Sequence, residues 1–146
     1  MGSSMSAKKR SFTIRQTKDV ELVKSLHSEI LPSDDFYWSH YPVYHWVVRD
    51  EKRNPVGFCS IAMWDSKIGF LCRSGVLPEA RGNGLQVRMT RVREKFARAA
   101  GYESMVTYTD VDNIRSSHNL QKIGYMLFEP EQKWAGKSYL YWMKKI

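Results

Sequence analysis

The sequence predicts an α/β fold: a mixed, mostly antiparallel sheet of about six to seven strands, with a central parallel β-α-β unit and flanking helices. Three strand-like segments between residues 44 and 77 follow one another with only short turns between them, as in an antiparallel meander. A long amphipathic helical pattern then lies between two strand-like segments, which favours a crossover between parallel neighbours. Residues 10–146 contain no repeat and no linker, so we expect one domain.

The domain begins with a strand and a helix. Residues 10–17 alternate apolar and polar side chains, which is typical of a half-buried strand. Apolar residues then recur at helical spacing over 20–30, until Pro32 ends the pattern. Residues 1–9 resemble a vector leader, so we expect them to be disordered and exclude them from the domain.

The predicted meander has strands over 44–51, 56–65 and 68–77, separated by turn-forming residues. The preceding stretch, 33–46, is dense in aromatic residues and fits an irregular helix or a loop.

The second half of the domain starts with a helix over 85–100 that Gly101 ends. One face of this helix is predicted to be apolar, and it carries Leu85, Met89, Val92, Phe96 and Ala99 or Ala100. A strand over 102–110 and a short helix over 113–122, closed by Gly124, follow. The last two strands are expected over 125–129 and 138–144.

Net charge, hydrophobicity and cysteine content limit the kinds of partner and site that the protein can have. The net charge of +8 indicates an acidic partner: nucleic acid, a phosphorylated cofactor or an acidic protein surface. No apolar run approaches the ~18 residues that span a bilayer, and no signal segment is evident, so we expect a cytoplasmic protein without a membrane partner. Cys59 and Cys72 are too few for a disulfide framework or a zinc cluster, so we expect buried free thiols and no metal.

A glycine-rich junction joins the third meander strand to the long helix. Residues 81–86 read RGNGLQ, with two glycines separated by one residue. Such a junction exposes backbone N–H groups at the positive end of a helix dipole, which suits a phosphate. It would lie at the edge of the sheet where open α/β folds bind ligands.

The element order, the RGNGL junction and the later segment NIRSSHNLQKIGY together resemble the GNAT superfamily of acyl-CoA-dependent N-acyltransferases, over residues 10–146. The resemblance implies an enzyme that moves an acetyl group from acetyl-CoA to a primary amine of a small molecule or a protein, directly within a ternary complex.

The resemblance also implies the coenzyme A site. The family's pyrophosphate loop follows the pattern Q/R-x-x-G-x-G/A, which this chain matches except at Gln86. The pantetheine arm is expected to lie beside the strand that ends at the junction. The cofactor-binding residues so implied are Val76, Leu77, Arg81, Gly82, Asn83, Gly84, Leu85, Gln86, Asn113, Ser116 and Lys122.

Two catalytic groups of the family are missing from their usual positions. Leu120 stands where the family often has a tyrosine that protonates the departing thiolate, and Cys72-Arg73-Ser74 replaces the usual acidic base. The acid candidates are then Tyr108, Tyr125 and Ser116, and the candidates for a base acting through water are Asp110 and His118. Each has a structural alternative: the tyrosines as core residues, the aspartate as a helix cap and the histidine as a surface residue.

The sequence leaves alternatives for the acceptor site and for the binding partner. Tyr37, Trp38 and Tyr41 either line the acceptor site or belong to a small core beneath a loop. A basic stripe on the long helix is predicted to be its solvated face, and binding to nucleic acid is the alternative. The stripe comprises Arg88, Arg91, Lys95 and Arg98. The alternative functions are an inactive coenzyme A-binding regulatory module and a basic protein acting on nucleic acid. The chain is expected to be a monomer or a homodimer.

Overall fold

The computed structural model describes residues 10–36 and 40–146 and contains one seven-stranded sheet. The predicted leader, residues 1–9, lies outside the described residues. The strands are β1 (Thr13–Thr17), β2 (Val43–Arg49), β3 (Pro55–Met63), β4 (Ile68–Val76), β5 (Ser104–Asp110), β6 (Met126–Leu127) and β7 (Tyr139–Lys145). The helices are α1 (Val20–Ile30), α2 (Leu85–Ala99) and α3 (Ile114–Lys122), and a 3-10 turn covers Pro78–Ala80.

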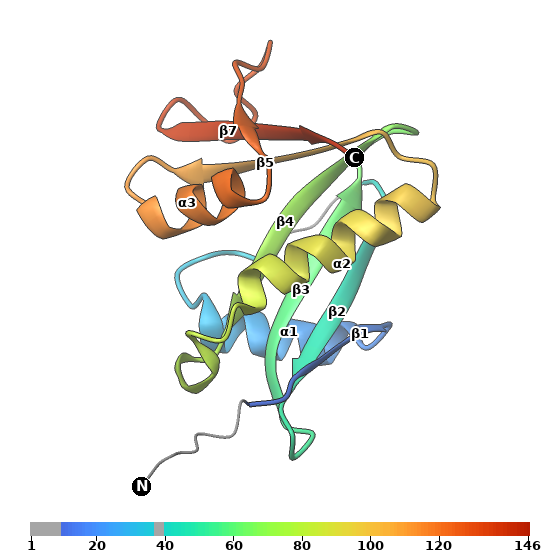
Figure 1. Cartoon of the computed structure of the whole chain (residues 1–146), viewed down its shortest axis with the longest axis vertical. Helices are drawn as coiled ribbons and strands as arrows, with labels where there is room; N and C mark the ends of the chain where they lie inside the picture. Colours follow the sequence, from blue (N-terminus) through green and yellow to red (C-terminus); the bar gives the residue numbers. More distant parts are fainter. Residues whose placement is uncertain (1–9, 37–39) are drawn as a thin grey trace, which may run out of the picture.

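The strand order is β1-β2-β3-β4-β5-β7-β6 (Figure 1). β1 to β4 pair with one another in antiparallel fashion, as do β5, β7 and β6, whereas β4 and β5 are parallel. The predicted meander, the crossover through α2 and the α/β fold class are therefore confirmed.

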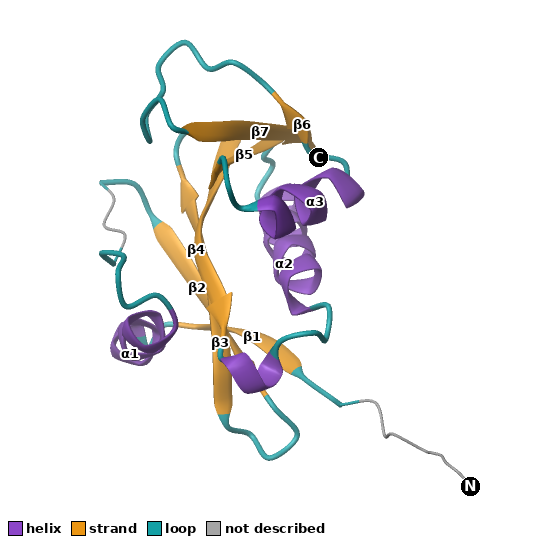
Figure 2. Ribbon diagram, turned by 90° about the vertical axis from the view of Figure 1, so that its left-hand side faces the viewer, coloured by secondary structure: helices purple, strands orange, loops and turns teal. Residues whose placement is uncertain are grey.

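Helices cover the sheet on both faces (Figure 2). α1 lies on one side, and α2 and α3 lie on the other. Val23 and Leu26 of α1 pack with Val47 and Phe58 of the sheet. The larger cluster includes the buried apolar residues of α2 together with Trp142 of β7. The site described below lies on the α2 side, where the two groups of antiparallel strands meet.

The predicted helix ends agree with the structure. The side chains of Asp19 and Asn113 cap α1 and α3 by accepting hydrogen bonds from backbone N–H groups three residues on. Gly101 and Gly124 follow the ends of α2 and α3 with φ of 85° and 97°, a region that favours glycine.

The buried face of α2 differs from the prediction. Leu85 and Met89 are buried as expected, but Val92 and Phe96 are only partly buried, and Ala99 and Ala100 are exposed. The buried set instead includes Thr90, Arg93, Glu94 and Ala97. The reason is that α2 packs against β3, β4 and α3. Its two buried charges, Arg93 and Glu94, form hydrogen bonds there with β3, with the segment after α3 and with β7.

No helix in the described part of the chain is long and apolar enough to cross a membrane. Within the same residues, no group of three or more histidine, cysteine, aspartate or glutamate side chains could hold a metal ion.

Candidate active site

The parallel strands β4 and β5 stay paired only at one end. Residues 68–70 pair with 104–106, and the Thr107 hydroxyl then donates a 2.9 Å hydrogen bond to the Leu71 carbonyl. Beyond this point β4 runs on to Val76 and β5 to Asp110 with no further pairing between them. The two strands therefore enclose a gap that is closed at the Thr107 end and open at the carboxyl ends.

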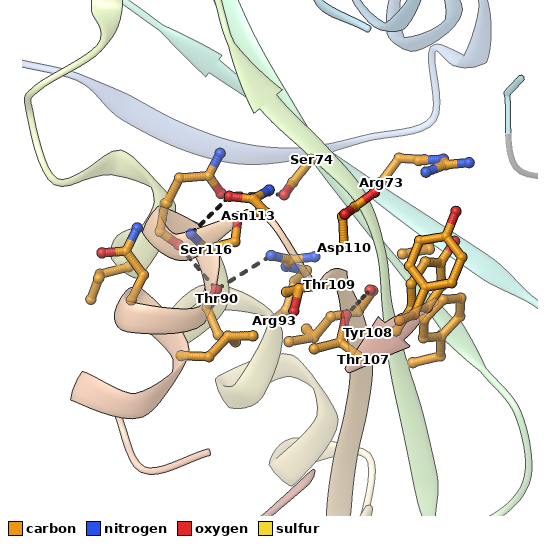
Figure 3. A pocket seen from close by; sticks show the side chains of 18 of the residues that line it. Arg73, Ser74, Thr90, Arg93, Thr107, Tyr108, Thr109, Asp110, Asn113 and Ser116 are labelled. Atoms are coloured by element: carbon orange, nitrogen blue, oxygen red, sulfur yellow. Dashed lines mark hydrogen bonds between the residues drawn. The ribbon is translucent and has the colours of Figure 1, made fainter. Parts of the chain in front are cut away.

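A cavity of about 340 Å³ occupies this gap (Figure 3). Four elements supply most of its wall: residues 70–74 of β4, residues 107–110 of β5, Gln86, Val87, Thr90 and Arg93 of α2, and Asn113, Ser116, Asn119 and Leu120 in and before α3. The cavity is large enough for a small ligand or part of a larger one.

The wall formed by α2 is polar. Gln86, Thr90 and Arg93 recur at helical spacing and all line the cavity. The Ser74 hydroxyl donates to the Gln86 side chain at 3.3 Å, and the Thr90 hydroxyl donates to the Gln86 carbonyl at 3.0 Å. Gln86 therefore contributes an amide to the cavity where the family pattern has a glycine or an alanine.

Arg93 forms a hydrogen bond at a β-bulge between β3 and β4. The register between β3 and β4 skips from Cys59↔Ser74 to Ile61↔Leu71, so that β4 carries one extra residue opposite Ser60. The buried Arg93 guanidinium donates to the Ser60 carbonyl at 3.0 Å. The sequence prediction missed this role, because a charged residue in an amphipathic helix reads as part of the solvated face.

The glycine junction has the backbone that an anion site requires. Gly82 and Gly84 have φ of 80° and 70°, and a Cβ at either position would meet no heavy atom within 4 Å. The side chain of Asn83 donates to the Ala80 carbonyl at 2.9 Å, which closes the turn. The first N–H groups of α2 follow directly, and such groups lack partners within the helix.

The remaining predicted cofactor residues differ in burial and in their distance from the cavity lining. Arg81 is exposed on the turn, whereas Val76 and Leu77 are buried. The Leu77 N–H donates to the Val56 carbonyl at 2.7 Å, so it is not free to polarise a thioester. Leu85 lies in the core, and Lys122 is exposed in the last turn of α3, outside the cavity lining.

The catalytic candidates separate into two groups. Tyr108, Asp110 and Ser116 all line the cavity, but Tyr125 does not. The Tyr125 hydroxyl instead donates to Glu94 at 2.8 Å. His118 is exposed and lies outside the cavity lining, which agrees with the alternative that it is a surface residue.

Part of the cavity wall is aromatic. The ring of Tyr108 stacks on Phe70 with centroids 5.9 Å apart and meets Tyr139 edge-on at 5.0 Å. Burial raises the pKa of Tyr108. Of the predicted acceptor residues, Tyr41 is 52% exposed and outside the lining, whereas 37 and 38 lie outside the described residues. Sequence reasoning named Tyr108 as an acid candidate but missed Phe70 and Tyr139, because alternating strands place aromatic residues in many cores.

The thiols of both cysteines stay protonated. Cys59 is buried as expected, but the expectation was wrong for Cys72, which is only partly buried because it lines the cavity. Burial raises their pKa values to about 11 and about 12. The neighbouring Arg73 pairs with Asp34 at 3.6 Å, so these two charges offset one another at the cavity wall.

Similar folds occur among solved structures. A protein of Klebsiella pneumoniae solved as a candidate acyl-CoA N-acyltransferase has a TM-score of 0.76 at 19% identity, over 92% of this chain and 97% of that chain. A GNAT family acetyltransferase of Elizabethkingia anophelis with bound acetyl-CoA has a TM-score of 0.74 at 14% identity, over 92% and 98%. A variant of the spermidine N-acetyltransferase of Vibrio cholerae has a TM-score of 0.72 at 13% identity, over 92% and 93%.

No curated protein sequence matches the chain. The sequence profile of the Acetyltransferase (GNAT) family, however, matches residues 14–125, which is most of the domain. This match includes β4, the glycine junction, α2, β5 and α3. The chain therefore belongs to the GNAT family of acetyltransferases, which carry out acyl-CoA-dependent acetyl transfer.

Proposed function

We propose that this chain is an N-acetyltransferase that moves the acetyl group of acetyl-CoA directly onto a primary amine in a ternary complex. The cavity between the diverging strands β4 and β5 carries this proposal. Residues of α2 that follow the glycine junction line it, and Phe70, Tyr108 and Tyr139 add an aromatic part to its wall.

The donor site is proposed along the unpaired edge of β4. An extended pantetheine arm can add to a strand edge much as a peptide does, through backbone hydrogen bonds. Ser74, Gln86, Asn113 and Ser116 offer polar groups along that path. The pyrophosphate would rest on the glycine junction, where the dipole of α2 favours negative charge.

The reaction needs a neutral amine, a polarised thioester carbonyl and protonation of the leaving sulfur. The amine nitrogen forms a bond to the carbonyl carbon, the C–S bond breaks, and one amine proton ends on the sulfur of coenzyme A. We assign protonation of the thiolate to Tyr108, because this residue lines the cavity and its raised pKa keeps its hydroxyl protonated. Asp110, exposed at the outer end of β5, is the candidate base acting through water, and Ser116 is an alternative donor.

The acceptor is proposed to approach from the aromatic wall. The aromatic faces of Phe70, Tyr108 and Tyr139 suit an apolar body that carries an amine, because ring faces also attract cations. That the structurally similar Vibrio cholerae enzyme is a spermidine N-acetyltransferase supports an amine acceptor of this general kind.

Calorimetric titration of acetyl-CoA into the protein, followed by a thiol-release assay with a panel of amines, tests the proposal. Binding followed by amine-dependent thiol release is expected. Absence of coenzyme A binding would refute it.

A second candidate function is a coenzyme A-binding module without turnover. Leu120, a buried residue of the cavity wall, favours it, because the family often has a catalytic tyrosine there. Binding without thiol release across small amines, polyamines and peptide amines would favour this function over the enzyme.

A further inference from the structure

The cavity wall contains a buried arginine that has no counter-ion among the residues that the structure describes. Arg93 is 2% exposed and belongs to the cavity lining. Within the described part of the chain, its guanidinium donates to three neutral oxygens, those of the Met89 and Ser60 carbonyls and the Thr90 hydroxyl. Five N–H groups are present on a guanidinium, so donors remain beyond these three bonds. Buried charges in proteins are normally paired, which makes this one unusual.

The other charges near the cavity do not neutralise Arg93. Glu94, its neighbour in the chain, accepts hydrogen bonds from a tyrosine and a lysine elsewhere in the fold. Asp34 pairs with Arg73. Asp110 is exposed at the outer end of β5, and no carboxylate within residues 10–36 and 40–146 forms an ion pair with Arg93. The inner part of the cavity is therefore positively charged.

Arg93 lies at the closed end of the gap. α2 runs back from the open edge of the sheet toward the paired end of β4 and β5, and Arg93 follows Gln86 by seven residues, about 10 Å along the helix. Figure 3 shows its guanidinium joined to the Thr90 hydroxyl by a hydrogen bond. A donor that enters over the glycine junction would point its acyl end toward this guanidinium.

We propose that the site accepts, besides acetyl-CoA, a coenzyme A thioester of a dicarboxylic acid, such as malonyl-CoA or succinyl-CoA, whose free carboxylate pairs with Arg93, and that it binds this donor in preference to an alkyl thioester of equal length. This inference rests on the proposed function of the cavity as the acyl-CoA site. A guanidinium fork matches a carboxylate in geometry and charge. An alkyl group of equal length would remove water from the guanidinium without replacing its hydrogen bonds, so the same site rejects it.

Transfer of such a group follows the same chemistry. The acceptor nitrogen bonds to the thioester carbonyl carbon, the C–S bond breaks and one amine proton ends on the coenzyme A sulfur. The product amide keeps the distal carboxylate, which takes no part in the bond changes.

Titration calorimetry on the full chain tests the proposal without knowledge of the acceptor. The probes are coenzyme A and two pairs of equal chain length: malonyl-CoA with propionyl-CoA, and succinyl-CoA with butyryl-CoA. At least one carboxylated thioester is expected to bind about tenfold more tightly than its alkyl partner. Equal or weaker binding of both carboxylated thioesters, with coenzyme A itself bound, would overturn this inference alone. Failure of every probe to bind would overturn the proposed function with it.

Variants assign the preference to the guanidinium. Arg93→Met should abolish the preference for the carboxylated thioester, and Arg93→Lys should keep part of it. Arg91→Met, which removes an exposed arginine of the same helix, is the matched control and should leave the preference unchanged. A preference that survives in a folded Arg93→Met protein would overturn the assignment. So would a lower rate of transfer for all donors alike with unchanged donor preference, because that result places the charge at the thioester carbonyl.

Discussion

The hydroxyl of Tyr125 donates a 2.8 Å hydrogen bond to Oε2 of Glu94, and both side chains are 2% exposed. Lys144 of β7 donates to the same carboxylate at 3.1 Å. The three residues join α2, the segment after α3 and the last strand behind the cavity. Burial, and then the Glu94 carboxylate, raise the pKa of Tyr125, so its hydroxyl stays a donor. This arrangement gives Tyr125 a structural role rather than a place among the reacting groups.

Tyr125→Phe should lower the free energy of unfolding by about 1–3 kcal/mol, because a buried carboxylate loses one donor. Urea denaturation measures this change. Acetyl-CoA affinity and turnover of the folded variant should stay near wild type, since Tyr125 does not line the cavity. Loss of turnover with an unchanged free energy of unfolding would instead indicate that Tyr125 takes part in catalysis.

The fold could be predicted because local patterns set it. Strand alternation, the caps at Asp19 and Asn113 and the glycines after α2 and α3 are all short-range signals, and each agrees with the structure. The burial of Arg93 and Glu94 could not be predicted in this way, since their partners are Ser60 in β3 and, across the fold, Tyr125 and Lys144.

The candidate site was predictable only where a motif exists. The glycine junction and Asn113 carry such a motif. The cavity wall of Thr90, Arg93 and Tyr139 does not, because it forms only when the parallel strands diverge and α2 packs over the gap.

Gly84→Trp should weaken coenzyme A binding by about 100-fold, or about 2.8 kcal/mol, because the indole would fill the space proposed for the pyrophosphate. The control is Gly101→Trp at the other end of α2. Both glycines have positive φ and open space around a Cβ, so both variants carry similar backbone strain. Titration calorimetry should find reduced affinity for the Gly84 variant only. Equal affinities of the two folded variants would remove the pyrophosphate assignment.

Asn113→Ala should weaken acetyl-CoA more than ADP, since the proposed contact of this side chain is with the pantetheine arm. The variant also loses the cap of α3, where Asn113 accepts from the Ser116 N–H at 3.1 Å, at a cost of about 1 kcal/mol of stability. Asp19→Ala removes the equivalent 3.1 Å cap of α1, remote from the cavity, and controls for that cost. Equal losses of acetyl-CoA and ADP affinity in the Asn113 variant would contradict the pantetheine role.

Tyr108→Phe should lower kcat by about 100-fold while leaving the Kd of acetyl-CoA unchanged, because general acids contribute at least this much. Tyr139→Phe, a neighbouring tyrosine of the same wall, is the control and should keep most of the activity. Since burial raises the pKa of Tyr108 above its ordinary value near 10, the wild-type rate should show no alkaline loss from this group below about pH 10. Full activity of Tyr108→Phe would assign the proton to Ser116 or to water.

Stability should depend on pH through His27. This α1 residue is 2% exposed, meets the rings of Phe36 and Phe58, and its Nε2 has no hydrogen-bond partner among the described residues. Burial, and then the nearby Arg73, lower its pKa in the folded state, although Asp34 and Asp35 oppose the shift.

Because the folded pKa lies below the unfolded value near 6.5, the unfolded chain takes up the proton first. The stability from neutral His27 is therefore complete above pH 6.5 and declines as pH falls below it, by up to about 1.4 kcal/mol per pH unit. Urea denaturation between about pH 7.5 and about pH 5, a range that brackets the ordinary histidine pKa, measures how the free energy of unfolding changes with pH. This slope should be smaller for His27→Met than for wild type. Part of the slope should remain, since burial also lowers the pKa of His45. Identical slopes would mean that His27 binds its proton inside the folded protein.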